Sequence, residues 1–215
     1  MNFTIMLQQL GQGLIVSVEI FLLTLLFSLP LGLVIAFGRM SKNNLIKGIV
    51  NIYISIMRGT PLMLQLIVVY FVPYYLFGWS IGGYRFPAII IAFSINYAAY
   101  FAEIYRGGIE SIAKGQYEAA QILGFSKVQT FFKIIFPQVI KRILPSTTNE
   151  VITLVKDTSL AFVLAQAEMF TIAKQIAAKE SSIMPLMVAG VFYYVFNALV
   201  AYIMSVVEKK LSYYR

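Results

Sequence analysis

The chain has 215 residues, of which 60% are hydrophobic and only 12% are charged, and its mean hydropathy is +0.80. An average soluble domain is about 45–50% apolar and about 25% charged, so a soluble fold could not bury this much apolar surface. The composition also excludes intrinsic disorder, which requires low hydrophobicity. Cys and His are absent, which excludes disulfides, thiolate catalysis, Ser-His-Asp triads and the H-E-x-x-H zinc motif.

The net charge is +8, from 17 Lys and Arg residues against 9 Asp and Glu residues. The basic residues are scattered between apolar runs, whereas a nucleic-acid-binding surface needs them clustered on one face. In a membrane protein such an excess usually marks the cytoplasmic loops. We therefore expect an all-α integral membrane protein embedded in a lipid bilayer, with no binding of nucleic acid.

The first two membrane spans are predicted at residues 20–38 and 48–78. The first is expected to be a retained transmembrane helix, because the first basic residue is Arg39 and a signal peptide carries positive charge ahead of its apolar core. The second is interrupted by the sequence Arg58-Gly59-Thr60-Pro61. Pro61 lacks a backbone donor, so we expect a kink or a break at that point.

Three further spans are predicted at residues 86–103, 142–164 and 185–207. A span needs about 20 apolar residues, and the third and fourth are weaker because they contain charged side chains. Between the last two, residues 166–179 have an amphipathic pattern that suits a helix lying along the outer membrane interface. The chain thus reads as one transmembrane domain, residues 1–215, with five transmembrane helices.

Five spans place the two termini on opposite sides of the membrane. With the N-terminus outside, most basic residues fall in inner segments, at 39–47, 106–142 and 209–215. Only Arg85, Lys174 and Lys179 then fall in outer segments. Cytoplasmic loops are enriched in Lys and Arg, so the sequence predicts an N-terminus outside and a C-terminus inside.

The one long inner segment, residues 106–138, is predicted to contain two short helices. Residues 116–124 are rich in good helix formers, and Gly124 is a suitable left-handed end. Residues 126–129 have the capping-box form S-x-x-Q, and the helix that follows is expected to end before Pro137. Such a pair would project from the membrane as a knob, although an ordinary amphipathic connector has a similar composition.

The sequence Glu118-Ala119-Ala120, with Gly124 three residues beyond Gln121 and Ile134-Ile135-Phe136-Pro137 farther on, closely resembles the EAA loop of ABC-type importer permeases. In that family the loop is the coupling helix, which docks in a groove on the ATP-binding subunit. The resemblance implies that the ATPase-coupling residues are Tyr117, Glu118, Ala119, Ala120 and Gly124.

Other stretches resemble the permeases for polar amino acids, the histidine, glutamine and arginine uptake group. They are Arg58-Gly59-Thr60-Pro61-Leu62, Ala98-Ala99-Tyr100, Glu103-Ile104, Arg106-Gly107-Gly108-Ile109, Gly115-Gln116 and Leu154-Val155-Lys156-Asp157-Thr158-Ser159-Leu160. They cover nearly the whole chain in order, so they are more specific than the EAA loop alone. One departure is Phe136-Pro137, where the family usually has Leu-Pro.

The resemblance implies an ABC importer permease fold and a prokaryotic cell membrane. It also implies three kinds of partner. They are a second permease chain (identical or related), a dimer of ATP-binding cassette subunits and an extracytoplasmic amino-acid-binding protein. ATP and magnesium would bind to the ATPase partner, and this chain would hold no cofactor and catalyse no reaction. Residues 108–115 are the nearest approach to a phosphate-binding loop, but Ala113 and Gly115 stand where the motif needs Gly and a hydroxyl.

Charged side chains inside a bilayer are costly, and they usually face a pathway or pair with one another. The candidate substrate-binding residues within the predicted spans are Met57, Arg58, Asn96, Glu103, Lys156 and Asp157. We expect Asp157 and Glu103 to hold positive groups of an amino acid, and Arg58 or Lys156 to face its carboxylate. A broken helix near Pro61 would add backbone dipoles.

The same side chains also permit a purely structural interpretation. Arg58 or Lys156 could neutralise a carboxylate of its own bundle, Glu103 could pair with Arg106, and Met57 could simply pack.

Two other functions also remain open on the residues alone. One is an ATPase-independent secondary transporter or channel, which would leave the knob without a purpose. The other is an intramembrane enzyme that uses Ser159 with Lys156. The acidic residues favour a basic amino acid as cargo, but they do not identify it.

Overall fold

The computed structural model describes residues 2–211, which are helical throughout apart from short connections. The C-terminal residues 212–215, which the predicted inner segment 209–215 includes, lie outside the described part. The helices in chain order are α1 (Phe3–Arg39), α2 (Asn44–Gly59), α3 (Leu62–Phe77), α4 (Arg85–Glu110), α5 (Lys114–Ile122), α6 (Lys127–Gln129), the π-helix η1 (Thr130–Ile135), α7 (Phe136–Asp157), the 3₁₀-helix η2 (Thr158–Leu164), α8 (Met169–Glu180) and α9 (Met184–Leu211).

Three of these helices, α1, α4 and α9, are each long and apolar enough to cross a membrane. Two further candidates are bent pairs: α2 meets α3 at 113°, and the run Lys127–Leu164 meets α8 at 57°. Counting each bent pair as one span gives five, and the described helices therefore provide three to five candidate spans. The five predicted spans correspond to the upper count.

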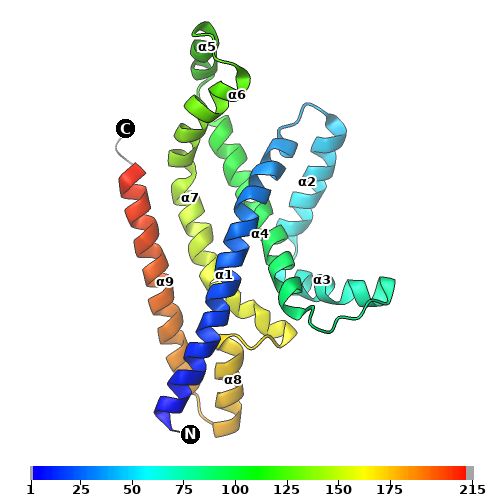
Figure 1. The fold of residues 1–215 in the computed structure, drawn as a ribbon, viewed down its shortest axis with the longest axis vertical. Helices are drawn as coiled ribbons and strands as arrows, with labels where there is room; N and C mark the ends of the chain where they lie inside the picture. The colour runs from blue at the N-terminus through cyan, green and yellow to red at the C-terminus, as the bar shows by residue number, and fades with distance from the viewer. Residues whose placement is uncertain (1, 212–215) are drawn as a thin grey trace.

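The helices form an elongated bundle with distinct ends (Figure 1). α1 begins at one end, beside α8, and runs to the opposite end, where it turns into α2. α5 and α6 lie at this second end, and α9 finishes on the same side. α3 points sideways, away from the bundle. The start of α1 and the end of α9 thus lie toward opposite ends of the molecule, which is the arrangement that an odd number of spans requires.

The centre of the bundle is the close contact between α1 and α4. On α1, the buried residues Thr24, Ser28, Gly32 and Ala36 recur at intervals of four and so occupy one face. A Cβ atom on Gly32 would lie 2.8 Å from Cβ of Phe101 on α4. Small residues allow two helix backbones to approach closely where lipid offers no hydrophobic driving force. This contact gives α4 a fixed position, from which its polar residues reach the neighbouring helices.

The break predicted at Pro61 is confirmed, and so are two signals in the long inner segment. α2 ends at Gly59 and α3 begins at Leu62, with Pro61 as the N-cap residue of α3. Gly124 follows α5 with φ of +77°. The capping box is present at Ser126, whose hydroxyl accepts from the Gln129 backbone N–H at 3.3 Å.

The prediction that the second loop helix ends before Pro137 is wrong. The helix continues from α6 through η1 into α7, with Pro137 in the first turn of α7. At this junction the Phe136 N–H donates to the Phe131 carbonyl, five residues back, which is the wider π pattern. We attribute the continuity to this widened turn, because a proline ring in a regular helix clashes with the carbonyl four residues earlier.

Candidate functional site

A polar cavity of about 440 Å³ lies where the α2–α3 break meets α4 and the C-terminal half of α7. It is lined by Thr60, Pro61, Leu62, Asn96, Tyr97, Tyr100, Glu150, Thr153, Asp157 and Leu160. Two carboxylates, Glu150 and Asp157, face this space, and its lining contains no Lys or Arg. We call it the central cavity. Its chemistry suits a ligand with a positively charged group.

Asp157 is the last residue of α7 and is half-buried. The Tyr97 hydroxyl donates to its Oδ2 atom at 2.7 Å, so α4 fixes the orientation of this carboxylate. Lys156, its neighbour in the sequence, is exposed and does not line the cavity. The structure therefore places Asp157 in the cavity and Lys156 outside it.

The broken helix is held by two amide side chains. Asn96 Nδ2 donates to the Met57 carbonyl and to Gln65 Oε1, both at 2.9 Å. Gln65 Nε2 in turn donates to the Met57 carbonyl at 3.0 Å and to Thr60 Oγ1 at 2.8 Å. Backbone carbonyls freed by a break inside a membrane need such partners, because lipid offers none. Asn96 and Met57 thus shape the wall of the cavity.

The same break turns the N-terminus of α3 toward the cavity, since Pro61 and Leu62 line it. The N-terminus of a helix carries a partial positive charge. The cavity therefore combines a positive backbone end on one wall with two carboxylates on another.

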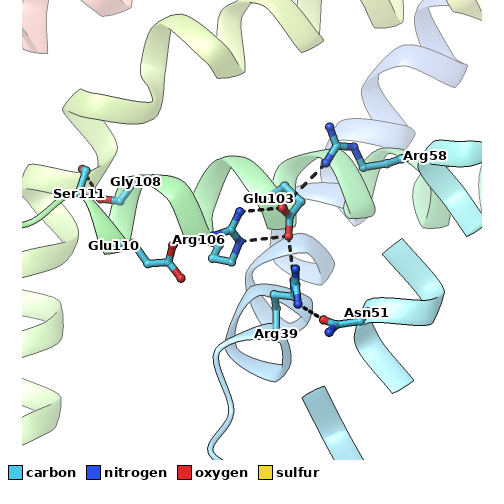
Figure 2. A network of polar contacts seen from close by, with 8 residues as sticks. All are labelled: Arg39, Asn51, Arg58, Glu103, Arg106, Gly108, Glu110 and Ser111. Atoms are coloured by element: carbon cyan, nitrogen blue, oxygen red, sulfur yellow. Dashed lines mark hydrogen bonds and ion pairs between the residues drawn. The ribbon is translucent and has the colours of Figure 1, made fainter. Parts of the chain in front are cut away.

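Glu103 lies outside the central cavity, in a cluster of arginines from three helices (Figure 2). Its carboxylate contacts Arg106 Nη2 at 2.8 Å, Arg39 Nε at 3.2 Å and Arg58 Nη1 at 3.9 Å. Arg39 also donates to the side chain of Asn51 on α2. Glu103 is thus paired with Arg106, as the structural interpretation expects, and its ion pairs join α1, α2 and α4 near their ends.

Arg58 reaches from the end of α2 toward both Glu103 and the central cavity. Its guanidinium carbon lies 5.3 Å from the ring centroid of Tyr100, a cation–π distance. Tyr100 lines the cavity, so Arg58 lies at its rim. The Arg58 side chain is 44% exposed, against 26% and 30% for Arg39 and Arg106.

The predicted coupling residues form the projecting end of the molecule (Figure 1). Ala120 is buried, whereas Glu118 and Ala119 are exposed. At the tip of α5, Ile122 and Leu123 are 86% and 73% exposed. The knob therefore presents apolar side chains away from the bundle.

Tyr117 on the same knob lines a separate cavity of about 640 Å³, with Gln121, Phe125 and Phe131. Partial burial raises the pKa of the Tyr117 hydroxyl, which therefore remains protonated at neutral pH. This ring and its neighbours join the base of the knob to η1.

The predicted site left out several residues that line the central cavity, among them Tyr97, Glu150 and Thr153, and the buried carboxylate of Glu168. Glu150, Thr153 and Asp157 recur at intervals of three and four, so helical spacing alone places them on one face of α7. Tyr97 had no comparable signal, because its partner is 60 residues away. The predicted interfacial segment 166–179 corresponds to α8, and its N-cap residue, Glu168, is fully buried.

A comparison with protein families matches residues 28–213 to the model of the binding-protein-dependent transport system inner membrane component. This chain belongs to that family. It is a multi-pass permease of the bacterial inner membrane, the transmembrane part of an amino acid ABC transporter, and it is not itself an enzyme. A binding-protein-dependent ABC transporter implies ATPase subunits and a binding protein as partners.

Several curated relatives match the permease over almost its full length. The arginine transport system permease protein ArtQ of Bacillus subtilis is 37% identical over 94% of this chain and 91% of its own. The L-cystine permease TcyB of the same organism is 35% identical, covering 95% and 87% of the two chains. The putative glutamine permease GlnP of Rickettsia conorii is 33% identical, covering 93% and 91%.

Solved structures agree with the fold of the permease. The crystal structure of an amino acid ABC transporter with histidines matches with a TM-score of 0.85 and 32% identity, over 98% of this chain and 99% of the other. An inward-facing structure of the methionine transporter MetNI matches with a TM-score of 0.73 over 99% and 100% of the two chains. At 16% identity this second likeness concerns the fold alone.

Proposed function

We propose that the permease and a second permease chain, identical or related, form the pathway for a polar amino acid that a binding protein delivers, and that the central cavity holds this amino acid. The observation that carries the proposal is the opposed polarity of the cavity walls. Glu150 and Asp157 line the same polar space as Pro61 and Leu62 at the N-terminus of α3. A free amino acid has the matching pair of charges.

In this arrangement Asp157 and Glu150 hold the ammonium group. The N-terminus of α3 and Arg58 at the rim face the carboxylate. Asn96 and the Met57 carbonyl act indirectly by holding the break open, and Glu103 acts by holding Arg58. Lys156 contributes positive charge at the exposed surface of α7 rather than a direct contact.

The charge of the cavity favours an amino acid with a basic side chain. One carboxylate suffices for the ammonium group, so the second is left for another positive group. The relatives are named for arginine, cystine and glutamine. Arginine and cystine each carry two positively charged groups, whereas glutamine carries one, and only arginine among them has a basic side chain. An amino acid with a single ammonium group, such as glutamine, would leave one of the two carboxylates without an opposite charge.

We further propose five spans with the N-terminus outside and the C-terminus inside, which places α5 in the cytoplasm. There α5 docks on an ATP-binding cassette subunit through Tyr117, Glu118 and Ala119, the buried Ala120 packs beneath them, and Gly124 makes the turn that ends the knob. The exposed side chains of Ile122 and Leu123 support a contact of this kind. ATP and magnesium bind to the ATPase subunits, and nucleotide binding and hydrolysis drive the change between inward- and outward-facing states.

The substitution Asp157→Asn tests the cavity as the amino acid site. Asn keeps an acceptor for Tyr97 but removes the negative charge. A hydrogen bond to a charged group contributes about 1.5–3 kcal/mol, so we expect uptake into proteoliposomes to fall by about ten-fold or more. The ATPase subunits should co-purify as before. Uptake is measured with each of the twenty amino acids and the cognate binding protein.

The matched control is Lys156→Gln, which removes a charge from the adjacent residue outside the cavity. This variant should retain most of the uptake. Normal transport by Asp157→Asn would show that the Asp157 carboxylate is not part of the amino acid site. Equal losses in both variants would indicate a general effect of charge on α7 instead.

A further inference from the structure

A second cavity, of about 480 Å³, lies between α4 and α7 on the side of α5. Its polar lining comes from Glu103 on α4, from Ser111 directly after α4, and from Arg142 and Ser146 on α7. Arg142 donates to the Ser111 carbonyl and so closes the far wall. We call this space the inner cavity. Nothing in the proposed function so far uses it.

The two cavities follow one another along the same faces of the same two helices. On α4, Tyr100 lines the central cavity and Gly107, seven residues later, lines the inner one. On α7, Glu150 lines the central cavity and Ser146, one turn away, lines the inner one. Residues at these spacings share a helix face. The two spaces therefore lie in succession along one line of the α4–α7 pair, which we call the track and which leads toward α5.

Arg58 contacts one lining residue of each space and is itself part of neither lining. Its guanidinium carbon lies 5.3 Å from the ring centroid of Tyr100, which belongs to the central cavity. Its Nη1 atom lies 3.9 Å from Oε2 of Glu103, which belongs to the inner cavity. Figure 2 shows Arg58 on one side of Glu103, with Gly108 and Ser111 of the inner cavity farther along α4 on the other side.

The three arginines around Glu103 are not held equally. Arg106 contacts both carboxylate oxygens, at 3.2 and 2.8 Å, and Arg39 contacts one oxygen at 3.2 Å. Arg58 has the longest contact and the most exposed side chain. Short two-point ion pairs are strong, whereas a long exposed pair is weak. Glu103 is thus fixed by two arginines, and Arg58 is the one that can leave.

Arg58 also has other partners on the side of the central cavity. It lies within electrostatic reach of Glu150. An amino acid in the central cavity would add its own carboxylate, which is the group that the proposed function assigns to Arg58. The loaded cavity therefore competes with Glu103 for the same guanidinium.

We propose that Arg58 is a gate between the two cavities and that the inner cavity is the exit site for the amino acid. When Arg58 pairs with Glu103, it separates the central cavity from the inner one. When Arg58 moves to a carboxylate on the central side, the track opens toward α5. The nature of the cargo rests on the proposed function, but the separation of the cavities by Arg58 does not.

The absence of Cys from the chain permits a direct test by thiol labelling. Thr153→Cys places one thiol in the central cavity, and Ser146→Cys places one in the inner cavity. A membrane-impermeant cationic thiosulfonate is applied to inside-out vesicles that contain the whole transporter, without nucleotide and with ATP plus vanadate. A separate Lys114→Cys variant, at the exposed start of α5, reports that this end faces the reagent.

We expect Ser146→Cys to react in both states and Thr153→Cys to be protected in at least one. Adding Arg58→Ala should raise the rate at which the central-cavity thiol reacts in the protected state roughly ten-fold, which corresponds to about 1.4 kcal/mol. The rate at which the inner-cavity thiol reacts should not change. Arg39→Ala is the matched control, because it removes another Glu103 partner but leaves Arg58, and it should keep the central-cavity thiol protected. Arg58→Lys, which retains a cation, should also keep it protected.

Protection that persists in Arg58→Ala, or that is lost equally in Arg39→Ala, would overturn the gate. So would a central-cavity thiol that already reacts fast in both states with Arg58 present. An unchanged rate for the inner-cavity thiol, together with normal co-purification of the ATPase subunits, shows that each variant is assembled. Slowing of the reaction in Thr153→Cys by an added amino acid tests the proposed cargo separately, so either proposal can fail alone.

Discussion

Two buried or half-buried polar residues on α4, Asn96 and Glu103, show how similar side chains acquire different roles within a membrane. Asn96 satisfies the Met57 carbonyl and Gln65 at the helix break. Glu103 neutralises arginines from three helices. Each removes a cost that lipid would otherwise impose on an unpaired group. Their contribution to transport is therefore expected to pass through the parts they hold in place.

Asn96→Ala should destabilise the permease, because it leaves the Met57 carbonyl and Gln65 with one partner fewer. Losing a buried partner costs about 1–3 kcal/mol, and in a chain of this size each kcal/mol lowers Tm by roughly 2–4 °C. Thermal unfolding of the detergent-purified transporter measures the effect. Ser94→Ala, also buried on α4, is the control, since its hydroxyl has no hydrogen-bond partner among the described residues. Equal Tm values for the two variants would contradict this role.

At this scale the sequence indicates which residues are chemically unusual, but not their partners. Asp157 and Arg58 were identified because charge is costly in an apolar run. The partner of Asp157 could not be identified, because Tyr97 is 60 positions away. The same holds for Glu103, whose contact with Arg39 spans 64 positions. The Glu103–Arg106 pair could be predicted, because the two residues are three positions apart on one helix.

At the scale of elements, α8 is seated against α1 through one close approach. A Cβ atom on Gly13 would lie 2.7 Å from Cα of Met169, the first residue of α8. Beside this contact, Glu168 accepts hydrogen bonds from the backbone N–H groups of Phe170 and Thr171, each at 2.7 Å. The buried carboxylate thus caps α8 where its backbone touches α1.

Gly13→Ala should weaken the α1–α8 contact, because the added methyl group would overlap backbone atoms that cannot rotate away. Overpacking of this kind costs about 1–3 kcal/mol. Gly11→Ala is the matched control on the same helix, where an added Cβ would meet nothing within 4 Å. Thermal unfolding should separate the two variants by several degrees, and identical curves would show that α8 moves aside at no cost.

Local signals predicted the elements well wherever one residue decides the backbone. Pro61 broke α2 from α3, Ser126 opened the capping box and Gly124 adopted positive φ. Pro137 led to the wrong prediction of a helix end, because its effect depends on whether the preceding turn widens. That widening depends on how η1 packs against α5 and α7, which no local pattern encodes.

At the scale of the whole molecule, the proposed orientation makes a prediction about which residues each side can reach. Lys42 lies in the turn between α1 and α2, at the same end as α5, whereas Lys179 lies in α8 at the opposite end. A membrane-impermeant maleimide should therefore label Lys42→Cys from the cytoplasmic side and Lys179→Cys from the outside. The unmodified chain, which has no Cys, is the blank. The reverse pattern would invert the proposed topology.

The sequence predicted where the apolar helical runs lie better than how they assemble. Hydropathy is summed along the chain, so it marks each apolar run. The central cavity needs the α2–α3 break, α4 and the end of α7 to meet, and that meeting depends on side-chain packing between distant segments. The resemblance to amino acid permeases supplied what periodicity could not.

The uninterrupted run from Lys127 to Asp157 gives the permease a lever. It passes from the base of the knob through η1 into α7 and measures roughly 45 Å at about 1.5 Å per residue. Through such a rigid element each end can affect the other, and thermodynamic linkage makes the two effects on equilibrium binding equal. If nucleotide on the motor subunits alters how tightly the carboxylate end grips its cargo, then cargo must alter nucleotide affinity by an equal factor. The effect of nucleotide on cargo binding and the effect of cargo on nucleotide binding are then two measurements of one coupling free energy.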